Sequence, residues 1–220
     1  MAETAAPPRR AFAMCLIVHK PSGLRIPHEL LEAALTLNPD GWGVMGFEHD
    51  GRLLLDRGTH IDAAALRDFE SRHIEAEYAL HLRKQTRGSS GLENTHPFRI
   101  VEGLYLMHNG TLPIEARLPG RSDTWHFTAE VLRPLAQRHP GLLSDYAFVR
   151  LLELGLRPEN KLALLDERLR RIVLINRGHG AEFEGLWLSN TRWIDRARFP
   201  LALTPQPQER SWTPEELEFL

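Results

Sequence analysis

The sequence predicts a layered α+β domain in which antiparallel sheets pack against helices. The first observation is a series of strand-like runs, several joined by hairpins, at residues 14–19, 42–48, 52–56, 78–83, 104–108, 161–166, 171–176 and 186–189. The second is that the helical patterns are grouped and do not alternate strictly with these runs, which argues against a doubly wound parallel sheet. The third is the length, because 220 residues suffice for one domain with a substantial core.

Two pairs of strands are predicted to form hairpins. The dipeptide Asp50-Gly51 separates the second and third strand-like runs and predicts a two-residue hairpin turn. Residues 167–170 separate two later runs and predict a second turn.

Helices are predicted from apolar spacing and from residues typical of helix ends. Phe127, Val131 and Leu135 recur on one face of a helix that begins at Ser122 or Asp123, either of which is a good N-cap. Thr213-Pro214-Glu215-Glu216 is a capping box that predicts a short terminal helix. The remaining predicted helices, with the one just described, cover residues 28–37, 62–72, 123–138 and 142–154.

The composition argues against several classes of partner. Hydrophobic content is 42%, charged content is 25% and formal net charge is −2, all typical of a globular chain. Basic residues are interleaved with acidic ones, so we expect no nucleic-acid partner. No apolar run approaches the roughly 20 residues needed to span a bilayer, so no membrane partner is expected. The eleven histidines show no ligand spacing, so neither a metal nor a cofactor is expected.

The chain contains one cysteine, Cys15, which directly follows Met14 in the first strand-like run. A lone cysteine cannot build a disulfide framework, but it can be a nucleophile. If Met14 is removed, Cys15 gains a free α-amine, whose ordinary pKa of about 8 makes it a base close to neutral pH. The alternative is a buried structural thiol. A single cysteine fits a reducing compartment, and we expect a cytoplasmic location.

Residues 1–14 require a separate interpretation. Their short apolar stretch and the absence of a small-residue cleavage site argue against a signal peptide. Three interpretations remain: a disordered leader, a cleaved propeptide, or a start codon assigned upstream of the true one. The third is simplest because Met14 directly precedes Cys15. The single domain is therefore predicted to span residues 15–220.

Three segments are more polar than ordinary strand ends. Asn-Gly usually marks a turn and an arginine at a strand end is usually solvated, so each segment alone is weak evidence. Their order and spacing are the informative part. The segments are Asn38-Pro39-Asp40-Gly41-Trp42-Gly43, then His81 to Gly88 with Glu93-Asn94-Thr95-His96-Pro97-Phe98, and His108-Asn109-Gly110-Thr111.

Together with Met14-Cys15, these segments resemble the glutaminase domain of class II glutamine amidotransferases, which are N-terminal nucleophile (Ntn) hydrolases. The likeness is closest to small stand-alone members of bacteria and their viruses, with strings like NPDGWG, LENTHPF and HNG. It runs from Cys15 to about Asp123, with a weaker likeness at residues 187–190. It implies a four-layer αββα sandwich of two antiparallel sheets flanked by helices.

The resemblance also implies an activity and roles for the residues. Cys15 would attack the side-chain amide of L-glutamine, form a γ-glutamyl thioester and release ammonia, with its own α-amine as base. Asn109 and the backbone N–H of Gly110 would stabilise the oxyanion. Arg83 would hold the α-carboxylate through its guanidinium fork, and Asp123 would bind the α-ammonium.

Further residues of these segments are expected around the substrate. Thr86 and His108 would line the substrate pocket, with His108 and His96 supporting loops instead of transferring protons. Lys84 and Arg87 stand where family members often have tryptophan and histidine, which affects fine substrate preference more than the core mechanism. The residues expected to shape the pocket are Asn38, Asp40, Gly41, Trp42, Asn94 and His96.

Several alternatives remain open. Well-known two-domain members attach a synthase domain, for which the residues after Cys15 leave no room. We therefore expect a free-standing hydrolase or a subunit that feeds ammonia to a synthase partner, acting on glutamine or another small γ-glutamyl-like amide. A second interpretation is a Cys–His amidohydrolase or protease-like enzyme in which His96 or His108 activates Cys15. A third is a non-catalytic binding or structural module that keeps the fold.

Overall fold

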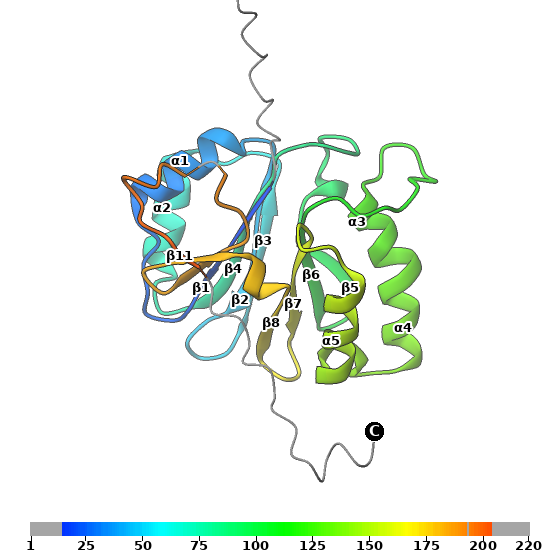
Figure 1. The fold of residues 1–220 in the computed structure, drawn as a ribbon. Coiled ribbons are helices and arrows are strands. Elements are labelled where there is room, and N and C mark those ends of the chain that lie inside the picture. The colour runs from blue at the N-terminus through cyan, green and yellow to red at the C-terminus, as the bar shows by residue number, and fades with distance from the viewer. Residues whose placement is uncertain (1–14, 193, 204–220) are drawn as a thin grey trace, which may run out of the picture.

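The computed structural model describes residues 15–192 and 194–203, which fold into four layers (Figure 1). Two antiparallel sheets lie face to face, and helices cover the outer face of each sheet (Figure 1). The prediction of two antiparallel sheets flanked by helices is confirmed. The predicted leader at 1–14 and the predicted capping box at 213–216 lie outside the described residues.

The larger sheet has seven strands in the order β11-β9-β10-β1-β4-β2-β3. Helices α1 (His28–Leu37) and α2 (Ala63–Arg72) cover its outer face (Figure 1). Strand β1 pairs with β4 on one side and β10 on the other, so the strand that follows Cys15 lies inside the sheet. The strands are β1 (Leu16–Lys20), β2 (Trp42–Phe47), β3 (Leu53–Gly58), β4 (Glu77–Leu82), β9 (Ala181–Phe183), β10 (Leu186–Leu188) and β11 (Ala202–Leu203).

The smaller sheet has four strands in the order β5-β6-β7-β8. Its strands are β5 (Phe98–Val101), β6 (Leu104–Asn109), β7 (Lys161–Asp166) and β8 (Arg171–Ile175). Its outer face is covered by α3 (Asp123–His126), the π-helix η2 (Phe127–Leu132), α4 (Arg133–Arg138) and α5 (Tyr146–Gly155). Three short 3-10 helices complete the described elements: η1 (Leu92–Asn94), η3 (Leu142–Ser144) and η4 (Arg177–His179).

The two sheets share an inner core. Ile17 of β1, Met107 of β6 and Ala163 of β7 are fully buried in one cluster between the sheets. The neighbouring residues Leu16 and Leu106 face the helical layers instead. Strands covered on both faces need apolar side chains at consecutive positions, which explains the continuous apolar runs of the sequence.

The hairpins differ slightly from their prediction. Glu48 N donates to Arg52 O at 2.9 Å, so the turn that this bond closes between β2 and β3 contains the three residues 49–51, not two. Gly51 has φ +82°, the left-handed conformation that a three-residue loop requires at this position. The predicted turn at 167–170 does join β7 to β8.

The long helix predicted over residues 123–138 is interrupted by a π-helical segment. Arg133 N donates to Thr128 O, five residues earlier. Pro134, near the start of α4, has no N–H for a normal helical bond. The predicted helix at 142–154 also begins later, at Tyr146, because the carboxylate of Asp145 caps it by accepting from Ala147 N and Phe148 N.

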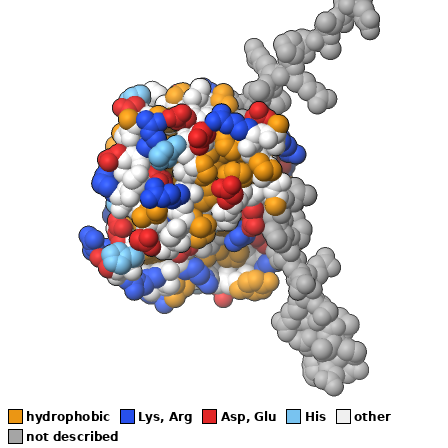
Figure 2. Space-filling view, turned by 90° about the vertical axis from the view of Figure 1, so that its left-hand side faces the viewer, with side chains coloured by type: hydrophobic (Ala, Val, Ile, Leu, Met, Phe, Trp, Pro, Cys, Tyr) orange, Lys and Arg blue, Asp and Glu red, His pale blue; other side chains and the backbone are white. Residues whose placement is uncertain are grey.

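On the face of the molecule that α1 and α2 cover, acidic and basic side chains are interspersed, and neither charge dominates (Figure 2). Among the described residues, no helix has the length and apolar character needed to cross a bilayer. The same residues contain no cluster of three or more His, Cys, Asp or Glu side chains placed to bind a metal ion.

Candidate active site

The Cys15 thiol is half-buried at the start of β1, beside the end of β4. Its Sγ donates to Lys84 O and accepts from Lys84 N, both at 3.3 Å. Burial raises the pKa of the thiol, against the opposing effects of the Lys84 main chain and the Arg83 charge. The resting group is therefore a thiol, and a nucleophilic attack requires a base.

Asn109 ends β6 and is held by Ser189, a serine at the end of β10. Asn109 Nδ2 donates to Ser189 Oγ at 2.8 Å, and Ile17 N donates to the same oxygen at 2.8 Å. Asn109 Oδ1 is buried and has no partner. A serine hydroxyl can also donate, so a carboxamide turned by 180° would accept from Ser189 and free its N–H group.

Gly110 follows Asn109 with φ +144°, a conformation that side chains rarely adopt. A Cβ at this position would lie 2.9 Å from the Cα of Asn160. Only glycine therefore fits here without strain, and it places the Gly110 backbone close to Asn160.

Arg83 is a buried cation at the end of β4. Its Nη2 donates to Ser89 O at 2.7 Å and to Arg87 O at 3.4 Å, while Nη1 is buried without a partner. Burial lowers its pKa, and within residues 15–192 and 194–203 it makes no ion pair. A buried, unpaired guanidinium is costly and is satisfied by a carboxylate.

Asp123 lies at the start of α3 and is buried. Its Oδ2 accepts from Leu112 N at 2.7 Å and its Oδ1 from Thr124 N at 2.9 Å. The N-cap is Ser122, whose hydroxyl accepts from Trp125 N. Asp123, Arg83 and Cys15 line one small cavity of about 30 Å³, so the structure brings a thiol, a guanidinium and a carboxyl group together.

His108 lines the same cavity but has both ring nitrogens engaged. Nδ1 lies 2.8 Å from Thr124 Oγ1, and Nε2 lies 3.0 Å from Asn160 Oδ1. Because the amide oxygen only accepts, Nε2 carries the proton and Nδ1 accepts from the threonine hydroxyl. Burial also lowers the pKa of His108, so the ring is a neutral support.

His81 and His96 form a second buried pair, with ring centroids 4.1 Å apart. Burial lowers the pKa of His81 to about 3 and holds that of His96 well below its ordinary value. Both rings are therefore neutral near pH 7. Neither is hydrogen-bonded to the Cys15 thiol, which bonds to the Lys84 main chain. The geometry does not supply the histidine base of the Cys–His alternative.

The loop before β2 supports the site indirectly. Asp40 Oδ2 accepts from Gln85 N at 2.8 Å, and Gly41 O accepts from Arg83 N at 2.8 Å. Asn38 is the C-cap of α1, with its Nδ2 bonded to Ala34 O. These contacts fix the segment that carries Arg83.

Trp42 lies in the outer core beneath the helices. Its ring packs edge-on against Phe69 at 6.0 Å, and its Nε1 donates to His60 O at 3.1 Å. It lines neither of the two cavities that Cys15 lines. The structure therefore places Trp42 away from the expected pocket wall.

Asn94 and Thr86 lie where pocket residues were predicted. Asn94 is buried, donates to Gly120 O at 2.7 Å and accepts from Ser122 N at 2.8 Å. It thereby joins the two loops that border the small cavity. Thr86 is exposed and lines both cavities beside Cys15.

Three supporting residues were not predicted as site residues. Ser189 holds Asn109, Asn190 Nδ2 donates to Cys15 O at 3.3 Å, and Asn160 holds His108 and packs against Gly110. The polar residues Ser189 and Asn190 lie at the end of the predicted strand 186–189, and this was the sequence signal that could have identified two of them. Their roles depend on strand pairing between distant parts of the chain.

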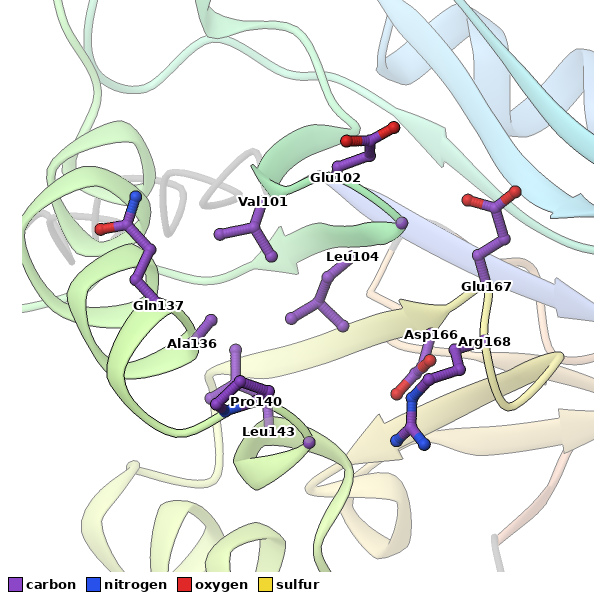
Figure 3. Close-up of a pocket in the computed structure, with 12 residues that line it drawn as sticks. Val101, Glu102, Leu104, Ala136, Gln137, Pro140, Leu143, Asp166, Glu167 and Arg168 are labelled. Atoms are coloured by element: carbon purple, nitrogen blue, oxygen red, sulfur yellow. The ribbon is translucent and has the colours of Figure 1, made fainter.

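Another cavity, of about 680 Å³, lies at the opposite end of the smaller sheet (Figure 3). Val101, Leu104 and Leu143 form its apolar wall, and Glu102 and Glu167 stand at its rim (Figure 3). It contains none of the predicted site residues.

Comparison with known proteins identifies the family of the chain. The family model described as glutamine amidotransferases class-II matches residues 16–157, more than half of the chain. The chain belongs to this family. The family assignment confirms the resemblance to class II glutamine amidotransferases, and the match begins one residue after Cys15.

One solved structure and the curated proteins complete the comparison. Glutamine phosphoribosylpyrophosphate amidotransferase from B. subtilis, complexed with ADP and GMP, is 16% identical with a TM-score of 0.48. The match covers 86% of this chain and 44% of the B. subtilis chain. The chain therefore spans less than half of the length of that protein. No curated protein matches the chain in sequence.

Proposed function

We propose that this class-II amidotransferase hydrolyses the side-chain amide of glutamine, or of a closely related γ-glutamyl amide, through a γ-glutamyl thioester on Cys15. The observation that carries the proposal is the unpaired Arg83 guanidinium. Its Nη1 is buried without a partner, and it lines one cavity with the Cys15 thiol and the Asp123 carboxylate. A zwitterionic amino-acid head group provides the carboxylate and the ammonium that this pair would bind.

The proposed reaction assigns a role to each of these groups. With the preceding residues removed, the α-amine of Cys15 takes the thiol proton as Sγ attacks the amide carbon. The Asn109 amide and the Gly110 N–H stabilise the oxyanion. The tetrahedral intermediate breaks its C–N bond, the amine returns the proton, and ammonia leaves. Water then hydrolyses the thioester to glutamate and restores the thiol.

The wider setting is also proposed. Ammonia released at this site either leaves as product or is consumed by a synthase partner. A free thiol as nucleophile is compatible with a reducing compartment such as the cytoplasm. The likeness to small stand-alone family members favours an independent hydrolase.

Covalent capture by a glutamine analogue tests this proposal. A chain that begins at Cys15 is incubated with 6-diazo-5-oxo-L-norleucine, and intact mass is measured. We expect one adduct, and because the chain has a single cysteine the labelled thiol is unambiguous. The D-enantiomer is the control, because its α-carboxylate and α-ammonium exchange places and no longer face Arg83 and Asp123. Absence of labelling by the L-enantiomer contradicts the proposal.

A further inference from the structure

Cys15 lines two cavities of very different size, which also share Thr86, Arg87 and Gly110. The small cavity of about 30 Å³ contains Arg83 and Asp123. The second cavity, of about 680 Å³, is lined by Cys15, Thr86, Arg87 and Gly110 together with residues of other loops. Because Arg83 and Asp123 would hold the amino-acid head group on one side of the thiol, a substituent on the scissile amide nitrogen would enter the larger cavity.

The larger cavity is much bigger than glutamine requires. Hydrolysis of glutamine releases only ammonia on that side. A space of about 680 Å³ is within the range of pockets that bury small organic ligands. The volume therefore fits a secondary amide with a substantial leaving amine.

The larger cavity is also positively charged. Arg87, Arg157 and Arg192 line it, against one acidic residue, Glu159. The only ion pair among these four, within the described part of the chain, joins Arg157 to Glu159 at 4.0 Å. The local excess is not a consequence of composition, because the whole chain has a net charge of −2.

A lysine lies in the cavity next to this one. Lys161, at the start of β7, is buried, and its pKa is lowered mainly by burial and also by the charge of Arg192. Arg192 and Glu159 also line the adjoining cavity that contains Lys161. The cationic surface therefore continues beyond the cavity wall, and an anion entering it would be attracted from several sides.

We propose that the preferred substrate of this site is a γ-glutamyl amide whose leaving amine carries an anionic group, such as the carboxylate of an amino acid or peptide. This inference rests on the proposed function and specifies its substrate class. The γ-glutamyl head group occupies the small cavity, and the anionic leaving amine occupies the cavity of Arg87, Arg157 and Arg192.

The reaction balances in the same way as glutamine hydrolysis. The Sγ–C bond forms and the C–N bond breaks, and the amine leaves with the proton taken from the thiol. Water hydrolyses the thioester to glutamate. The only change is that an anionic primary amine leaves in place of ammonia.

A substrate series tests the inference. The kcat/KM of a chain that begins at Cys15 is measured for glutamine, γ-glutamyl-methylamide and γ-glutamylglycine. We expect γ-glutamylglycine to exceed the neutral γ-glutamyl-methylamide by about tenfold at low salt, and this preference to fall as ionic strength rises. Equal values for the two secondary amides, or a clear preference for glutamine over both, overturn the inference.

Charge reversal identifies the residues responsible. Arg157→Glu with Arg192→Glu should remove the preference for γ-glutamylglycine while changing kcat/KM for γ-glutamyl-methylamide less than about threefold. Arg72→Glu, on the outer helix α2, is the matched control and should preserve the preference. A preference that survives the double reversal contradicts the assignment.

The two proposals fail differently. If 6-diazo-5-oxo-L-norleucine labels Cys15 and glutamine is hydrolysed without any anionic preference, the proposed function stands and this inference is wrong. If Cys15 is not labelled and no amide is hydrolysed, the proposed function itself fails.

Discussion

Arg83 has the most informative environment of any single side chain in the site. The rings of His81 and His96 lie nearby and are kept neutral, mainly by burial and partly by neighbouring positive charge that includes Arg83. Nothing within the described protein neutralises the guanidinium by an ion pair. A buried charge of this kind costs free energy that a bound carboxylate would offset.

Replacement of Arg83 tests its role as the carboxylate anchor. Arg83→Ala should raise the KM for glutamine by about 10- to 100-fold, because a charge-assisted hydrogen bond contributes roughly 1.5–3 kcal/mol. Arg83→Lys should be intermediate, since it keeps the charge and loses the fork. Steady-state kinetics on the chain beginning at Cys15 provide the measurement. An unchanged KM for Arg83→Ala would show that the carboxylate binds elsewhere.

Ser189 should act through Asn109. Ser189→Ala removes the hydroxyl that orients the carboxamide, so kcat should fall by about 10- to 100-fold with little change in KM. Thr128→Val, which also removes a buried hydroxyl, is the control for general destabilisation and should leave kcat within about twofold. Equal losses in the two variants would assign Ser189 a purely structural role.

The predictability of the site differs from residue to residue. Cys15, Arg83 and Asn109 lie in motifs whose order carries the resemblance. In the structure Cys15, Arg83 and Asp123 line one cavity, together with Gly110, which follows Asn109. Ser189 could not be predicted as a partner, because it meets Asn109 across a sequence separation of 80 residues. Its position is determined by the pairing of β10 with β1.

At the scale of elements, β1 has the Cys15 thiol just before one end and a buried lysine at the other. Lys20 Nζ donates to Ile74 O and Ala76 O, both at 2.7 Å, and lies over the Tyr78 ring. Burial lowers its pKa to about 8, although the nearby carboxylates oppose the shift. The strand end is therefore held by a cation among backbone carbonyls.

This lysine predicts a pH dependence of stability. Its pKa is about 8 in the folded protein and 10.5 in the unfolded chain, so between these values the unfolded chain binds more protons. The contribution of Lys20 to the free energy of unfolding should rise as pH increases from 8 toward 10. Above that range Tyr78, whose pKa burial raises, acts in the opposite direction.

Urea titrations between pH 7.5 and 9.5 check this dependence. The difference in unfolding free energy between the wild-type chain and Lys20→Met should grow with pH, because the variant lacks the titrating group. A difference that stays constant across the range contradicts the assignment of the lowered pKa.

Long apolar runs predicted the strands of both sheets, whereas short elements were missed. Strands β9 and β11 contain three and two residues, too few for a periodic pattern. Strand β5 begins at Phe98, the last residue of a polar segment, and its four residues include the exposed Arg99. The π-helical segment was missed because apolar spacing predicts only which face of a helix is buried. It does not show where the helical hydrogen-bond pattern changes near Pro134, which has no backbone N–H.

At the scale of the whole molecule, the site is divided between the two sheets. The larger sheet carries Cys15 and Arg83, and the smaller sheet carries Asn109 with Gly110 after it. Their relative placement depends on the inner core between the sheets. Packing in that core should therefore affect catalysis more than packing under the outer helices.

Replacing one buried alanine by valine in each core tests this dependence. Ala163→Val adds volume between the sheets and should destabilise the fold by about 1–3 kcal/mol and lower kcat by about tenfold. Ala76→Val adds the same volume to the outer core and should cost similar stability with kcat nearly unchanged. Thermal unfolding and single-turnover kinetics distinguish them. Equal effects on kcat would show that the inner core has no special influence on the site.

The central claim is that the α-amine of Cys15 is the base. The direct measurement is the rate of glutamate release from glutamine by a chain beginning at Cys15 and by the same chain with one alanine before it, with matched thermal stability. We predict that the added residue lowers kcat by at least about 10²-fold, as expected for loss of a general base. Equal rates for the two chains would contradict the account and assign activation of the thiol to another group.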